Sequence, residues 1–220
     1  MTLYCERTEP GWFPEPLNTV TGLAYFIASR QAWKQLERVR WREQWDLHLL
    51  AGLIAIVGVS SILWHASGIG WLFWLDVAAV ATFAAAYWGV FLFRVPRFGV
   101  IGLSVAWLFT GVGLVLFYLL LPGATAGTTL GYLPMLIILS AALILAVPVD
   151  RRLARDLVLA TAVVGLALVV RALDPVLCGW AVVGTHWLWH LLTAGLLFVL
   201  VDGMLRHVRL REAQGANDAG

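Results

Sequence analysis

The stretch LHLLAGLIAIVGVSSILWHASGIGWLFWLDVAAVATFAAAYWGVFLF, residues 47–93, contains two apolar runs joined by Ser67-Gly68-Ile69-Gly70. Each run, 47–66 and 70–93, is close to the roughly 20 residues that an α-helix needs to cross the hydrocarbon core of a bilayer. The glycines between them permit a tight turn. The sequence therefore predicts two antiparallel membrane-spanning helices that are neighbours in space.

Similar apolar runs recur along the chain, and proline marks several breaks: Val95-Pro96-Arg97 cannot continue a helix, and PGATAGTT from Pro122 is a loop. Charged residues make up 13% of the chain, against about 25% in soluble domains, and the mean hydropathy is +0.84. We therefore expect an all-α integral membrane protein with one domain over 1–220. It would be a seven-helix bundle over 17–204, with an outer tail 1–16 and a cytoplasmic tail 205–220. The expected spans are 17–33, 47–66, 70–93, 98–121, 130–148, 156–173 and 183–204.

Basic residues gather in alternate loops of this scheme. They are Arg30, Lys34, Arg38, Arg40 and Arg42, then Arg94 and Arg97, then Arg151, Arg152 and Arg155, and finally Arg206, Arg209 and Arg211. The other side has Arg7 and Arg171, and we expect Arg171 to snorkel outward. Because basic residues are enriched in cytoplasmic loops, the N-terminus is expected outside and the C-terminus in the cytoplasm. The net charge of +2 is too small to suggest a nucleic-acid partner.

Two further features belong to the outer side of this scheme. Cys5 and Cys178 both fall there, so a disulfide between them is a hypothesis for an oxidising compartment, with two unpaired thiols as the alternative. A set of tryptophans is most simply an outer interfacial belt: Trp64, Trp71, Trp74, Trp180, Trp187 and Trp189.

Four ionisable residues fall at similar depth near the outer ends of their helices, namely His65, Asp76, His186 and His190. Ionisable groups inside a membrane are costly, and they indicate function by default. His186 and His190 are spaced i,i+4, which puts both rings on one helix face. With His65 they would form a three-histidine site with an open position, as in catalytic zinc sites. Zn²⁺ suits neutral imidazoles, iron and manganese are alternatives, and simple hydrogen bonding between helices is the structural alternative.

Ser61 is the fifth candidate at this layer, since it lies i−4 to His65 and so on the same helix face. It could equally bond the carbonyl of its own preceding turn. Ser60 is an alternative to it.

These residues resemble the motifs of the alkaline ceramidase family, within a superfamily of seven-helix membrane hydrolases that includes adiponectin-receptor relatives. SSILWHAS…LD is similar to the family's Ser-x3-His followed by Asp, here Ser61, His65 and Asp76, and HWLWH matches its His-x3-His. EPLNT, from Glu15, resembles the motif that opens the first helix, with Cys5-Glu6 before it. The resemblance implies a zinc ion held by His65, His186 and His190, with Asp76 positioning or deprotonating the attacking water and Ser61 steadying the oxyanion. It also implies an outward-facing site and a Cys5–Cys178 disulfide.

Family members that bind calcium use acidic residues of this tail and the first-helix glutamate. Here Glu6, Glu15 and Asn18 match, but Leu3 and Thr8 stand where the pattern has Asp and Asn. The alternative is that Glu15 caps the first helix or supports a zinc ligand from behind.

The expected function is therefore zinc-dependent hydrolysis of the N-acyl bond in ceramide or a related membrane lipid, giving a fatty acid and an amine. Acyl chains would lie within the bundle, and the active site would face the extracytoplasmic side. Two alternatives stay open: an ester hydrolase or phospholipase with the same metal site, and a receptor-like protein with a structural zinc. A transporter is disfavoured because no inverted repeat is visible and the polar cluster sits at one end of the bundle.

Overall fold

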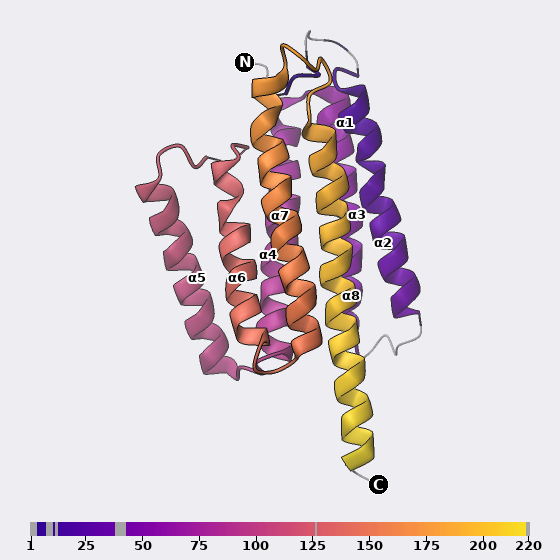
Figure 1. Ribbon diagram of the computed structural model, residues 1–220, viewed down its shortest axis with the longest axis vertical. Helices are drawn as coiled ribbons and strands as arrows, with labels where there is room; N and C mark the ends of the chain where they lie inside the picture. The colour runs from indigo at the N-terminus through magenta and orange to yellow at the C-terminus, as the bar shows by residue number, and fades with distance from the viewer. Residues whose placement is uncertain (1–3, 8–10, 12, 38–42, 126, 219–220) are drawn as a thin grey trace.

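The computed structural model describes residues 4–7, 11, 13–37, 43–125 and 127–218, and within them the chain forms helices and no strand. The helices run alongside one another as a bundle (Figure 1). Their bounds are α1 Pro16–Thr21, α2 Leu23–Leu36, α3 Trp45–Ser67, α4 Gly70–Arg94, α5 Val100–Leu120, the 3-10 turn η1 Leu130–Tyr132, α6 Leu133–Ala146, α7 Arg151–Leu177 and α8 His186–Asp218.

Among the described residues, five helices are long and apolar enough to cross a membrane: α3, α4, α5, α7 and α8. The chain is thus an all-α protein of the integral membrane class. The remaining two expected spans correspond to α2 and α6, which have 14 residues each and are shorter than the roughly 20 that span a bilayer unaided.

The turn between α3 and α4 is the one predicted from the sequence. Gly68 caps α3 with φ +66°, in the left-handed region that glycine reaches without steric cost. Because the turn is so short, the end of α3 and the start of α4 lie at one end of the bundle, where His65 and Asp76 are found.

The first expected span, 17–33, is divided at Gly22, where α1 passes into α2. A Cβ added at Gly22 would lie 2.7 Å from Cγ1 of Ile62 on α3. The absence of a side chain therefore lets the start of the chain pack closely against α3, next to the layer that holds Ser61 and His65.

The last helix extends well past its expected end at residue 204. Leu205, His207 and Val208 are buried, because this part of α8 continues to contact neighbouring helices. The cytoplasmic tail expected over 205–220 is therefore largely a continuation of α8, which runs to Asp218.

The core lies where α8 packs against α7, α2 and α3. Leu50 and Ile54 of α3 and Leu196 and Met204 of α8 are among its buried side chains. In contrast, α5 has no buried residue and lies at the edge of the bundle (Figure 1). Such an apolar surface suits a lipid environment.

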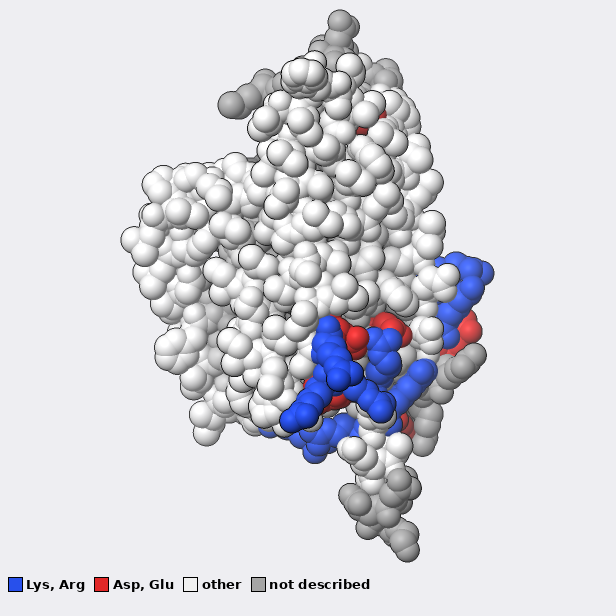
Figure 2. Space-filling model, viewed as in Figure 1, with Lys and Arg blue, Asp and Glu red and all other residues white. Residues whose placement is uncertain are grey.

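Charged side chains gather at one end of the molecule in the view of Figure 2, the end at which α8 continues toward the C-terminus. The opposite end holds the start of α8 and the end of α3.

Candidate metal centre

Three histidines meet at the end of the bundle away from the gathered charges. His65 lies in the last turn of α3, whereas His186 and His190 lie in the first two turns of α8. All three are buried, and one ring nitrogen from each lies within 4.8 Å of the others. The ring centroids are 4.8 Å apart for His65 and His190 and 5.2 Å for His65 and His186. This group could hold a metal ion.

His65 is oriented by Glu15, the residue that precedes α1. Nδ1 of His65 hydrogen-bonds Oε2 of Glu15, so the anionic carboxylate accepts the proton of Nδ1. Nε2 of His65 is buried and has no hydrogen-bond partner among the described residues. A carboxylate behind a histidine is the usual way to fix the tautomer of a metal ligand, which leaves the lone pair of Nε2 free for a cation.

His190 is oriented by Thr21 at the end of α1. Oγ1 of Thr21 lies 3.0 Å from Nδ1 of His190 and donates its proton to the carbonyl of Leu17, 2.8 Å away. The hydroxyl has a single proton, so it accepts one from Nδ1. Nε2 of His190, 3.5 Å from Oγ of Ser61, is thereby left unprotonated toward the site.

His186 has a different partner. Its Nδ1 lies 3.2 Å from Nη1 of Arg171, and a guanidinium can only donate, so Nδ1 accepts. The backbone N–H of His186 donates to Oδ1 of Asp174, 2.9 Å away, and Tyr4 stacks on the imidazole with 3.9 Å between ring centroids. The first turn of α8 is thus held by α7 on one side and covered by the N-terminal tail on the other.

His65 and His190 fit a divalent cation of the zinc type through their Nε2 atoms, whereas His186 offers its lone pair only once its Nδ1 no longer accepts from Arg171. Three neutral imidazoles with an open fourth position form a known catalytic zinc arrangement, with Zn–N distances of about 2.0–2.1 Å. Such distances bring the nitrogens to about 3.4 Å from one another, so the three side chains would have to move closer together than the 4.8 Å within which their ligand atoms now lie. Nε2 of His65 is buried without a hydrogen-bond partner among the described residues, and a bound ion would supply the partner that it lacks.

The structure separates the two serines of the sequence motif. Oγ of Ser61 lies 3.5 Å from Nε2 of His190, whereas Oγ of Ser60 lies 3.4 Å from Oδ1 of Asp76 and 3.0 Å from the carbonyl of Val57. Asp76 also interacts electrostatically with Arg171 and Glu15, which places it near the cluster although it is not one of the grouped ligands.

The N-terminal tail closes over the histidines. The predicted Cys5–Cys178 disulfide is present and joins the tail to the end of α7. Oδ2 of Asp174 accepts from the N–H of Cys5 over 3.1 Å. The tail is thereby anchored beside the start of α8, with Tyr4 placed over His186.

The acidic residues considered for calcium have other partners. The carboxylate of Glu6 accepts from the backbone N–H groups of Leu17 and Asn18, at 2.5 and 2.9 Å, so it caps α1. Glu15 accepts from Arg7 and His65, and from Nδ2 of Asn18 at 3.0 Å. Burial raises the pKa of Glu15, against the hydrogen bonds from Asn18 and Arg7 that lower it. Calcium needs six to eight oxygen ligands, so this geometry favours the supporting role of Glu15 behind His65.

Two sequence expectations require correction. Arg171 does not snorkel outward: its side chain points into the bundle, and the residue is 6% exposed. Trp64 and Trp189 are also buried, at 3% and 5%, whereas Trp71, Trp74 and Trp180 are exposed as an interfacial belt requires. Trp64 packs under the guanidinium of Arg7, 4.3 Å from its ring centroid, and Trp189 lies near Arg171.

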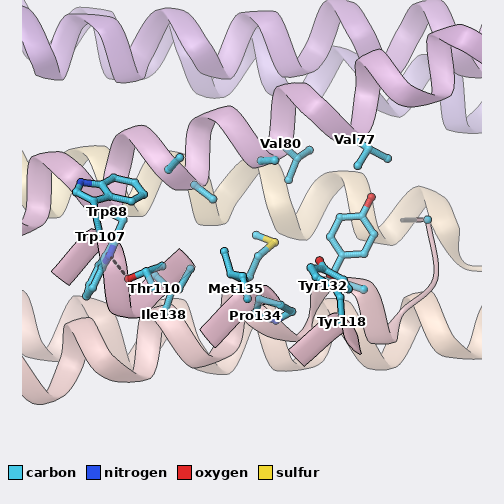
Figure 3. Close-up of a pocket in the computed structure, with 16 residues that line it drawn as sticks. Val77, Val80, Trp88, Trp107, Thr110, Tyr118, Tyr132, Pro134, Met135 and Ile138 are labelled. Atoms are coloured by element: carbon cyan, nitrogen blue, oxygen red, sulfur yellow. Dashed lines mark hydrogen bonds between the residues drawn. The ribbon is translucent and has the colours of Figure 1, made fainter. Parts of the chain in front are cut away.

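An apolar cleft of about 470 Å³ lies between α4, α5 and α6. Figure 3 shows Val77 and Tyr132 at one end of it and Trp88 and Trp107 at the other. Val77 follows Asp76 in the chain, so the cleft begins next to the polar layer and runs away from it along the helices.

Sequence reasoning missed Thr21, Tyr4, Asp174 and the inward direction of Arg171. Arg171 and Asp174 carried a signal, since both are charged residues in the apolar run that forms α7. Thr21 and Tyr4 carried none, because a single hydroxyl or ring in these positions is ordinary.

Comparison with known proteins yields no relative: no protein-family model, curated protein or solved structure matches the chain.

Proposed function

We propose that this chain is a metal-dependent lipid amide hydrolase of the membrane, with a site like that of the alkaline ceramidases. The observation that carries the proposal is the buried group of His65, His186 and His190, with Glu15 oriented behind His65. Buried imidazoles of this kind are costly in an apolar bundle unless they bind something. The motif likeness that spans Glu15 to His190 supplies the reaction class.

Zn²⁺ is the cation we propose, and when bound by three imidazoles it supplies Lewis-acid polarisation of a carbonyl and lowers the pKa of a water molecule toward about 7. Nε2 of His65 and Nε2 of His190 would hold it, and His186 would be the third ligand once its ring no longer accepts from Arg171.

Two side chains next to the histidines would act on the substrate. Asp76, whose Oδ1 lies 3.4 Å from Oγ of Ser60, would accept the proton of the attacking water and pass it to the leaving amine. Ser61, beside His190, would donate a hydrogen bond to the developing oxyanion, a contribution of about 2.7–4 kcal/mol for a single donor.

The cleft between α4, α5 and α6 is suited to an acyl chain. Its lining is apolar along most of its length, and Tyr132 lies at the end nearest the polar layer (Figure 3). The gathering of Lys and Arg at the opposite end of the molecule (Figure 2) supports a site that faces the extracytoplasmic side, because basic residues are enriched in cytoplasmic loops.

Metal analysis combined with turnover tests this proposal. Purified protein is expected to contain about one zinc ion per chain and to release fatty acid from N-acyl lipids. Chelation should abolish the release, and added Zn²⁺ should restore it. Metal bound without turnover of any lipid would instead indicate a receptor-like protein with a structural ion.

The role of Asp76 is tested by Asp76→Asn, with Asp156→Asn as the matched control. Asp156 lies on α7 and pairs with Arg206 of α8, far along that helix from His190. Asp76→Asn should lose nearly all hydrolysis while retaining zinc, and the control should retain both. Near-normal turnover by Asp76→Asn would show that another group is the base. Amide and ester analogues with one acyl chain then separate an amidase from a phospholipase-like ester hydrolase.

A further inference from the structure

Arg171 is a buried cation that forms no ion pair with any described aspartate or glutamate. Its polar contacts are neutral: Nδ1 of His186 at 3.2 Å, the carbonyl of Gly127 at 2.7 Å and the hydroxyl of Tyr4 at 3.4 Å. Its Nε is buried and has no partner among the described residues. A charge in a membrane-spanning helix is expensive unless it is paired. Asp76 acts on this guanidinium from beyond ion-pair distance, and no described carboxylate is in direct contact with it.

Other arginines of the bundle show the contrast. Arg94 pairs with Asp46, Arg7 with Glu15, and Arg206 with Asp156 and Asp202. Each of these side chains is more exposed than Arg171, yet each has a carboxylate. Arg171 is instead surrounded by aromatic rings, with Tyr132 and Trp189 centred 4.7 and 5.1 Å from its Cζ.

The guanidinium lies between the histidines and the apolar cleft. It contacts His186 on one side, whereas Gly127 and Tyr132, which it also contacts, line the cleft. An amphiphile with its chain in the cleft, near the Tyr132 end shown in Figure 3, therefore places its polar end within reach of Arg171.

We propose that Arg171 binds a carboxylate on the head group of the lipid, so that the preferred substrates are anionic N-acyl amino acids and not neutral amides of the ceramide type. This inference rests on the proposed hydrolase function. A guanidinium matches a carboxylate with two parallel hydrogen bonds, and the unpartnered Nε is available for one of them. The carboxylate of a released fatty acid has the same chemistry, and the experiment distinguishes the two sources.

Binding is measured first, on full-length protein stripped of metal and in the same detergent micelles, through tryptophan fluorescence, since Trp189 lies next to Arg171. The probes are N-palmitoylglycine, N-palmitoylethanolamine and palmitate, which share a chain length. Wild-type protein is expected to bind N-palmitoylglycine at least about ten-fold more tightly than N-palmitoylethanolamine, because a charge-assisted hydrogen bond distinguishes them. Equal affinities, or binding of neither, would overturn the inference without the need for any variant. Palmitate binding with no preference between the two amides would assign the carboxylate to the product and would also overturn it.

Variants then locate the preference. Arg171→Gln should reduce the ratio of the two affinities to about one, Arg171→Lys should retain part of it, and Arg206→Gln should leave it unchanged. In metal-loaded protein, Arg171→Gln should lower kcat/KM for N-palmitoylglycine alone. An equal loss for both amides would mean that Arg171 acts on the oxyanion and not on the head group. Hydrolysis of the neutral amide with no preference for the anionic one would sink this inference and leave the hydrolase function standing.

Discussion

Replacement of Glu15 tests the support behind His65 most directly. Oε2 of Glu15 accepts from His65 and Asn18, and Oε1 accepts from Arg7. In Glu15→Gln, the side-chain oxygen can still accept hydrogen bonds from His65 and Asn18 if the NH₂ group faces Arg7. The hydrogen bond to His65 then survives, but its acceptor is no longer an anion. Glu15→Ala removes the acceptor altogether and leaves the buried Nδ1–H of His65 unsatisfied.

The expected loss follows from that difference. Removal of a partner behind a metal-binding histidine costs about 10–100-fold in metal affinity, or about 1.4–2.7 kcal/mol. We expect Glu15→Gln near the lower end of this range and Glu15→Ala near the upper end. Zinc affinity is measured by competition with a chromophoric chelator at pH 7.5.

The matched control is Glu212→Gln. Glu212 accepts from Gln44 and lies far along α8 from His190, so the affinity of this variant for zinc should equal that of the wild type. Thermal unfolding of the metal-free variants establishes that they are folded. Folded Glu15→Gln protein with zinc affinity within about two-fold of the wild type would refute the orienting role of Glu15.

Three further outcomes are expected. Cys5→Ser should abolish the difference in gel mobility that the wild type shows between reducing and non-reducing conditions. It should also lower the stability of the fold by about 2–4 kcal/mol, as the loss of other native disulfides does. Equal mobility of the wild type under the two conditions would contradict the disulfide. Gly68→Ala should lower the stability of the fold by about 1–2 kcal/mol, because φ is +66° there. Gly70→Ala should change it little, because nothing lies within 4 Å of an added Cβ at that position. Equal melting temperatures of the two variants would argue against a left-handed cap at Gly68. At the other end, partial burial acts to raise the pKa of Asp150, but hydrogen bonds from His207, Leu153 and Arg152 outweigh it and hold that pKa below its ordinary value of 3.8. Asp150 therefore stabilises the fold above pH 3.8 and loses this effect as the pH falls through its lowered pKa. Asp150→Asn should reduce the fall in melting temperature on the acid side of a pH profile. Parallel pH profiles for the wild type and the variant would show that the hydrogen bonds of Asp150 contribute nothing to stability.

The helices could be predicted from the sequence because hydropathy and turn chemistry act between near neighbours in the chain. The glycine turn at Gly68 and the break at Pro96 follow from backbone geometry that each residue carries with it. The first span was less predictable, since its division at Gly22 reflects the approach of Ile62 on another helix. The extension of α8 beyond residue 204 depends likewise on packing around Leu205 and Val208.

Part of the candidate centre could also be predicted, because it depends on residues that are near one another in the chain. The i,i+4 spacing of His186 and His190 puts both rings on one face, and the short turn after α3 brings His65 and Asp76 to one end of the bundle. Hydropathy fixes where a helix begins and ends, but it contains no information on which residue of a distant segment faces a given side chain.

By itself, the sequence determined a membrane-embedded helical chain, the residues able to ligate a cation, and two cysteines able to join. Tertiary packing alone determined that Glu15 stands behind His65 from 50 positions away, that Thr21 orients His190 from 169 away, and that Arg171 turns inward. The physical reason is that a hydrogen bond acts over about 3 Å in space, so its partners are set by how α1, α3, α7 and α8 come together and not by their order along the chain.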